Sequence, residues 1–77
     1  MLHDNKKHSI FLNGYEVLRV EVNNNETKFY KVVENVAMKP TTKQDFIQTL
    51  NKLHNLNLIS KTEYNKIKML GVDQKWK

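Results

Sequence analysis

The chain of 77 residues has no cysteine, two glycines, one proline and a single arginine. Without cysteine it can form neither a disulfide framework nor a thiolate metal site. No apolar run approaches the roughly 18 residues that a membrane-spanning helix needs, and the first residues lack the apolar segment of a signal peptide. These absences predict a cytoplasmic protein that does not associate with membranes.

The length predicts one small domain over residues 1–77, with flexible tails at 1–7 and 73–77. Hydrophobic residues make up 39% of the chain, which is typical of a globular domain and not of a disordered one. A chain this short buries only about 60% of its unfolded surface, so a partner subunit would add to its stability. The opening Met1 favours a complete chain.

The net charge is +5, and lysine supplies twelve of the thirteen cations. Ten further residues are asparagine. Lysine and asparagine have A/T-rich codons, so this composition favours an A/T-rich genome, such as that of a low-GC bacterium or its phage. Part of the positive charge is then compositional. Arginine, which makes bidentate contacts to bases and phosphates, is represented by Arg19 alone.

Residues 8–36 have the pattern of three strands joined by short turns. Asn13-Gly14 is a strong signal for a two-residue hairpin turn. The stretch Tyr15–Val22 alternates as a half-buried strand does, and residues 23–26 form a second turn. The third strand spans Thr27–Val36, which is rich in β-branched and aromatic residues. The expected arrangement is a three-stranded antiparallel β-meander.

Residues 37–40 are expected to break the sheet, because Pro40 disfavours helical backbone in the residue before it. Thr42 is the predicted N-cap of a first helix, with Asp45 in its first turn, where a carboxylate suits the helix dipole. The apolar stripe of this helix consists of Phe46, Ile47, Leu50, Leu53 and His54.

A second helix begins after Ser60, because Ser60–Glu63 fits the capping box. Asn57 is the predicted left-handed stop of the first helix, and Gly71 ends the second, followed by Val72 in a Schellman cap. The fold class is therefore α+β: a three-stranded meander followed by an α-helical hairpin, residues 42–71, packed on one sheet face.

Within residues 44–72 the hairpin carries Leu50 and Leu53 on its first helix, a corner at residues 56–60, and Glu63-Tyr64 opening its second helix. This pattern resembles the SHOCT (short C-terminal) domain, a helical hairpin found at the ends of many bacterial and phage proteins. One departure is Asn57, where the family usually has glycine. The resemblance implies an accessory or interaction module and brings no catalytic residue. Residues 1–40 resemble no family.

The residues that carry catalysis in enzymes are sparse in this chain. There is no cysteine, Ser9 and Ser60 have structural roles, and no carboxylates form an acid–base pair. Three histidines, at positions 3, 8 and 54, lack the close spacing of a structural zinc site, and His54 extends the apolar stripe of its helix. We expect no enzyme activity, no metal and no cofactor.

The alternation of the strands assigns one sheet face to the core and leaves the other exposed. The predicted core face comprises Ile10, Leu12, Leu18, Val20, Val22, Tyr30, Val32 and Val36. The predicted outer face comprises Phe11, Tyr15, Val17, Arg19, Phe29, Lys31 and Val33. An exposed face that mixes aromatic residues with cations is typical of an interaction surface.

Several occupants of this outer face stay open: a second copy in a homodimer, a different protein, nucleic acid, or the chain's own N-terminal arm or Trp76. The favoured function is non-enzymatic docking on a protein partner. The alternative is a nucleic-acid-binding accessory factor, using either the sheet or the last helix. The candidate binding residues are Phe11, Tyr15, Arg19, Lys28, Phe29 and Lys31 on the sheet, and Lys61, Lys66 and Lys68 on the last helix.

Overall fold

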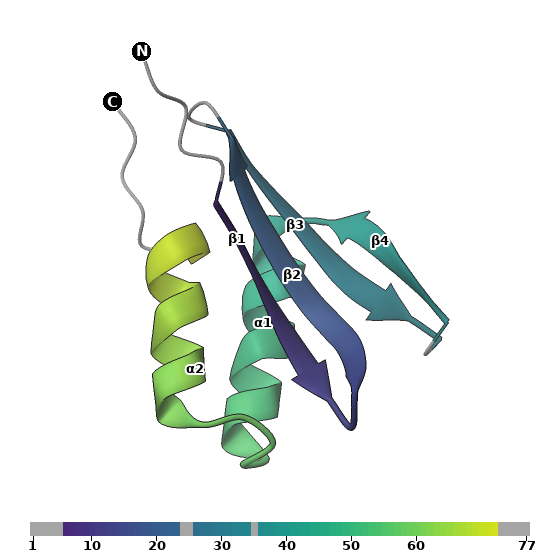
Figure 1. Cartoon of the computed structure of the whole chain (residues 1–77), viewed down its shortest axis with the longest axis vertical. Helices are drawn as coiled ribbons and strands as arrows, with labels where there is room; N and C mark the ends of the chain where they lie inside the picture. Colours follow the sequence, from purple (N-terminus) through teal and green to yellow (C-terminus); the bar gives the residue numbers. More distant parts are fainter. Residues whose placement is uncertain (1–5, 24–25, 35, 73–77) are drawn as a thin grey trace.

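A computed structural model of the chain describes residues 6–23, 26–34 and 36–72. An antiparallel sheet with strand order β1-β2-β3-β4 is followed by two helices that lie on one of its faces (Figure 1). The last helix continues into a short π-helical segment, η1. The elements are β1 (Lys6–Leu12), β2 (Tyr15–Asn23), β3 (Glu26–Val33), β4 (Ala37–Thr41), α1 (Lys43–Asn55), α2 (Lys61–Ile67) and η1 (Lys68–Val72).

The class α+β is correct, but the prediction of three strands was wrong, because residues 37–41 form a fourth. Pro40 lies within this strand, opposite Tyr30 of β3. Proline cannot donate to a strand ladder, so it is tolerated only where its nitrogen faces an open edge. β4 pairs only with β3 in the described sheet, and it offers such an edge. Pro40 therefore lies on an edge strand of the sheet and does not break the sheet as we had expected.

The hairpin between β1 and β2 turns at Asn13 and Gly14, whose φ angles of 53° and 84° match the predicted type I′ turn. The second turn is shorter than predicted, because Asn23 and Glu26 are paired and only residues 24–25 connect them. Those two residues lie outside the described part of the chain, as do residues 1–5, 35 and 73–77. Lys6 and Lys7, which we expected in the tail, belong to β1.

A β-bulge interrupts the pairing of β1 with β2. Ile10 faces Leu18, but the next residue, Phe11, faces Glu16, so Val17 is the extra residue of β2. The bulge places Glu16 on the same face as Arg19, and Val17 packs against the core cluster. The prediction that Val17 faces outward was wrong, because strict alternation does not hold across a bulge.

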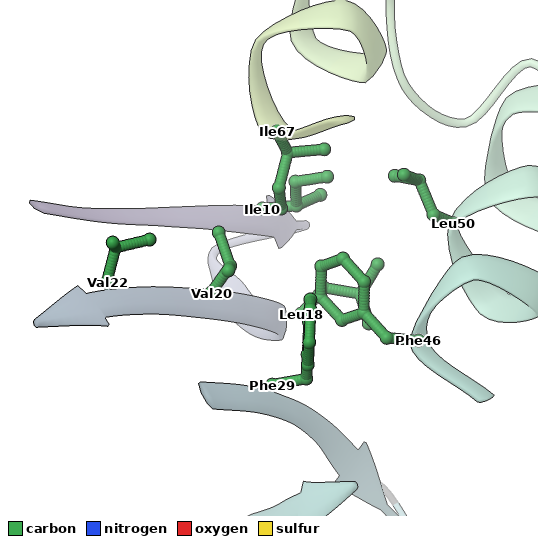
Figure 2. Packing of buried hydrophobic residues seen from close by; sticks show 8 residues of the cluster. All are labelled: Ile10, Leu18, Val20, Val22, Phe29, Phe46, Leu50 and Ile67. Carbon is green, nitrogen blue, oxygen red and sulfur yellow. The ribbon is translucent and has the colours of Figure 1, made fainter. Parts of the chain in front are cut away.

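The core lies between the inner sheet face and the two helices (Figure 2). Phe46 of α1 is fully buried and stacks at a tilt against Phe29 of β3, with ring centroids 4.8 Å apart. This pair closes one side of the core where α1 crosses β3. The buried hydrophobic residues in the described part of the chain are Ile10, Leu18, Val20, Val22, Phe29, Phe46, Leu50 and Ile67.

The faces of β3 are reversed relative to the prediction. Phe29 points into the core, and Tyr30 lies on the outer face under the Arg19 guanidinium. Val36, predicted in the core, lies in the turn after β3 and is 82% exposed. β3 carries apolar or aromatic residues at both its odd and its even positions, so the alternation of its side chains does not identify the buried face.

The predicted helix ends at Thr42, Asn57 and Ser60 are confirmed. The Thr42 and Ser60 hydroxyl oxygens each accept a 3.1 Å bond from the backbone N–H three residues on. Asn57 has φ 60°, and the N–H groups of Asn57 and Leu58 donate to the carbonyls of His54 and Leu53, which is the Schellman pattern. These ends depend on residues within one turn of each other, which explains their clear sequence signals.

Gly71 does not end the last helix, as we had predicted. The chain passes through it in the π-helical segment η1, and its φ angle is not in the left-handed region. A Cβ atom at this position would lie 2.6 Å from Val20 Cγ2 and 3.2 Å from Phe29 Cε1. Glycine is therefore required here by the close approach of η1 to the sheet, and not by a turn.

Asp45 joins α1 to the sheet. Its carboxylate lies 2.7 Å from Lys31 Nζ and accepts a 2.6 Å hydrogen bond from the Thr41 hydroxyl. The hydrogen bonds from Lys31 and then Thr41 lower the pKa of Asp45 below its ordinary value of 3.8. Because folding lowers this pKa, the ionised carboxylate stabilises the folded protein at pH values above the ordinary pKa of an aspartate. This stabilisation is lost as pH falls through the folded-state pKa.

We expect Asp45→Asn to lower the urea midpoint at neutral pH, with the difference from wild type shrinking as pH falls below about 4. Urea titrations of both proteins across this range measure the effect. Equal midpoints at neutral pH, or a difference that persists unchanged in acid, would contradict the role assigned to the carboxylate.

Candidate functional site

The outer sheet face is organised around Arg19. Its Nη1 donates to Glu21 at 3.1 Å, and its guanidinium lies over the Tyr30 ring, 4.9 Å from the centroid. Its Nε lies 3.2 Å from the Glu16 carboxylate but is buried and out of line for a hydrogen bond. Ser9 donates to the same carboxylate at 2.5 Å. The only arginine is thus held in place and neutralised by two glutamates.

The structure does not assemble the cationic and aromatic sheet site that the sequence predicted. Phe29 is buried, and Lys31 lies on the inner face, where it pairs with Asp45. Arg19 is occupied by its glutamates, so Lys28 is left as an exposed cation of β3. The three cations do not meet on one ridge, which removes the geometric basis for base stacking on this face.

Phe11 and Tyr15 keep their predicted exposure, with 59% and 75% of their surface accessible. They flank the β1–β2 turn at the same end of the long axis as the connection between α1 and α2 (Figure 1). That connection exposes two further apolar side chains, Leu56 at 57% and Leu58 at 49%. We call Phe11, Tyr15, Leu56 and Leu58 the apolar end.

Sequence reasoning missed half of the apolar end. Leu58 and Ile59 both lie in the corner at residues 56–60, but only Ile59 packs against the core cluster. No local signal indicated this exposure, because Leu58 follows the left-handed residue of a Schellman motif, a position whose apolar side chain frequently packs back on the helix. Leu56 is the C-cap of α1 and lies beyond its apolar stripe.

The helical hairpin is held together around Tyr64. Its ring stacks on His54 of α1 with centroids 4.3 Å apart, and its hydroxyl donates to Asn51 Oδ1 at 2.7 Å. Lys68 Nζ lies 5.6 Å from the centre of the same ring. His54 is therefore a packing residue of the hairpin, and Lys68 is half-buried, whereas Lys61 and Lys66 are exposed as predicted.

The Glu63 side chain departs from the predicted capping box. Its carboxylate accepts at 2.9 Å from His8 Nε2 of β1, and the Ser60 hydroxyl caps the Glu63 N–H as expected. His8 and Glu63 therefore tie α2 to the edge of the sheet. The described residues contain no group of three or more side chains placed to hold a metal ion.

A polar hollow of about 320 Å³ lies at the other end of the sheet, lined by Lys6, Lys7, Glu21 and Asn23. It has two cations and one carboxylate that is already bonded to Arg19. Its walls come from strand ends next to residues 1–5 and 24–25, which the structure does not describe. The described lining of the hollow does not bring a nucleophile and a base together.

Comparison of the chain with family models, curated proteins and solved structures found no match in any of the three. The resemblance to SHOCT domains therefore stays a prediction. Among the described residues, no helix is both long and apolar enough to span a bilayer.

Proposed function

We propose that this protein is a small, non-enzymatic binding protein of phage or mobile-element type that docks on a protein partner in the cytoplasm. The observation that supports the proposal is the apolar end, where aromatic and leucine side chains are exposed on two separate elements. Exposed aromatic and leucine side chains at one end of a molecule are typical of interaction surfaces, because binding a partner removes their apolar area from water.

The surroundings of the apolar end indicate the partner's chemistry. Lys61 follows the α1–α2 connection directly and is exposed, as is Lys52 near the end of α1. A partner with an apolar groove and carboxylates at its rim would complement this end, since opposite potentials across an interface favour encounter. The accessory role implied by the SHOCT-like hairpin agrees with such docking.

The double variant Phe11→Ser/Leu58→Ser tests this proposal, because it removes one anchor from each element. Each anchor contributes roughly 1.5–3 kcal/mol when buried, so we expect partner affinity to fall by at least about 100-fold. The measurement is recovery of a partner from a lysate of a low-GC bacterium, followed by affinity determination with the purified partner.

Val36→Ser/Met69→Ser is the matched control, since Val36 and Met69 are also exposed, at 82% and 66%, but lie elsewhere. It should retain the partner. Equal loss in both double variants, or no loss in the first, would refute the proposed surface. Sedimentation of the free protein tests whether a second copy occupies the apolar end. A dimer that dissociates only in the Phe11→Ser/Leu58→Ser variant would identify the second copy, and not a different protein, as the partner.

A further inference from the structure

We infer that the solvent side of the helical layer binds the phosphate backbone of double-stranded DNA. The surface consists of Lys52 of α1 and Lys61, Lys66 and Lys68 of α2 and η1, and we call it the lysine face. The inference goes beyond protein docking at the apolar end and does not depend on it.

The fold distributes charge unevenly across the helical layer. Residues 42–71 contain five lysines and two carboxylates, Asp45 and Glu63. Both carboxylates are bonded to cationic or ionisable side chains of the sheet, Asp45 to Lys31 and Glu63 to His8. The carboxylates are thus engaged with the sheet, and among the described residues no ion pair joins a carboxylate to Lys52, Lys61, Lys66 or Lys68.

The lysines lie among neutral polar side chains. The structure describes every residue from 42 to 71, and those that are exposed are Lys, Asn, Gln, Ser, Thr, Leu and Met. Amide and hydroxyl side chains donate to phosphate oxygens, as lysines do. Lys61, Asn65 and Lys68 recur at the spacing that places them on one stripe of the last helix. The surface therefore presents many donors for anionic oxygens.

The exposed side chains of the layer favour the duplex backbone over bases as the ligand. Aromatic rings are absent from the exposed residues of 42–71, so single-stranded bases have no stacking platform there. The segment also contains no arginine for bidentate base contacts. What remains is recognition of phosphates without sequence preference. The B-DNA major groove admits an α-helix, whereas the A-form RNA major groove is too narrow for side chains to read.

The apolar faces of both helices are already used inside the molecule. Phe46, Leu50 and Ile67 are buried in the core, and Tyr64 joins the two helices. A lipid surface would need an apolar helix face to insert beside the lysines. Among the described residues of the helical layer, the exposed apolar side chains are Leu56 and Leu58 of the α1–α2 connection and Met69 of η1, which do not form one helix face, so DNA fits this surface better than a lipid surface does.

Three to four lysine–phosphate contacts predict a slope of about −2.7 to −3.6 for log K against log salt, from about −0.9 per contact. Between about 50 and 200 mM salt, affinity should therefore fall about 40- to 150-fold. Fluorescence anisotropy with a labelled short duplex of mixed sequence measures both quantities, using the full chain.

Lys61→Gln/Lys66→Gln should reduce the magnitude of the slope by about 1.8, because two contacts are lost. The matched control is Lys28→Gln/Lys39→Gln, which removes the same charge from exposed positions on β3 and β4. Its slope should stay at the wild-type value. Circular dichroism of each variant confirms that the fold is retained.

No binding of the wild-type protein at low salt, or equal slopes in the two double variants, would overturn the inference. Tighter binding to a single strand or to an RNA duplex would reject double-stranded DNA as the ligand. The Phe11→Ser/Leu58→Ser variant separates the two proposals: it should bind DNA as wild type does even when its protein partner is lost.

Discussion

Replacing Phe46 with alanine should remove a large part of the protein's free energy of unfolding. Phe46 is fully buried, and its ring packs on Phe29. Truncating a buried phenylalanine costs about 3–5 kcal/mol. Domains of this size have about 4–12 kcal/mol of stability in total, from roughly 0.05–0.15 kcal/mol per residue. One side chain thus accounts for a large part of the free energy of unfolding.

Thermal and urea unfolding followed by circular dichroism measure this effect. A melting temperature lowered by at least about 12 °C is expected, since each kcal/mol shifts a small domain by about 4–8 °C. Phe11→Ala is the control, because Phe11 is 59% exposed and its loss should change stability by at most about 0.5 kcal/mol. Similar losses in the two variants would show that Phe46 is not the core residue described here.

The elements that could be predicted from the sequence are those encoded by neighbouring residues. The Asn13-Gly14 turn requires positive φ at two adjacent positions, and the Thr42 and Ser60 caps require one hydroxyl near free backbone N–H groups. Asn57 needs only its own tolerance of left-handed backbone. No distant contact competes with these local signals, so the structures that they predict are the ones that form in the folded protein.

The faces of β3 could not be predicted, because the choice is made by residues far away in the chain. Tyr30 and Phe29 both fit a half-buried strand, and the difference is that Phe46 of α1 packs on Phe29 while Arg19 stacks on Tyr30. The same choice determines the position of Lys31, which lies on the inner face together with Phe29. The wrong assignment of the two faces of β3 therefore explains why the predicted sheet site does not form.

The lysines of the last helix could be placed from the sequence, because its N-cap fixes the helical phase. What the sequence could not show is where the carboxylates point. Glu63 fits a capping box by spacing, yet its side chain reaches His8, which is 55 positions earlier in the chain. The charge of the lysine face therefore follows from tertiary contacts, although its lysines are visible in the sequence.

Gly71→Val should destabilise the protein by about 3 kcal/mol, at the upper end of what overpacking a core costs. A Cβ atom alone would already lie 2.6 Å from Val20 Cγ2, and valine adds two more methyl groups. Val20 is fully buried on a central strand and β-branched, so it has neither space nor a ready alternative rotamer. The segment η1 must then move away from the sheet.

Met69→Val separates this contact from the preferences of the helical backbone. Met69 lies in the same π-helical segment but is 66% exposed, so its replacement introduces a β-branched residue without touching the core. It should cost at most about 0.5 kcal/mol, and Gly71→Ala should fall between the two because it adds only the Cβ atom. Urea titrations of the three variants give this order. If Gly71→Val were no more costly than Met69→Val, η1 would not lie against β2 and β3 as described.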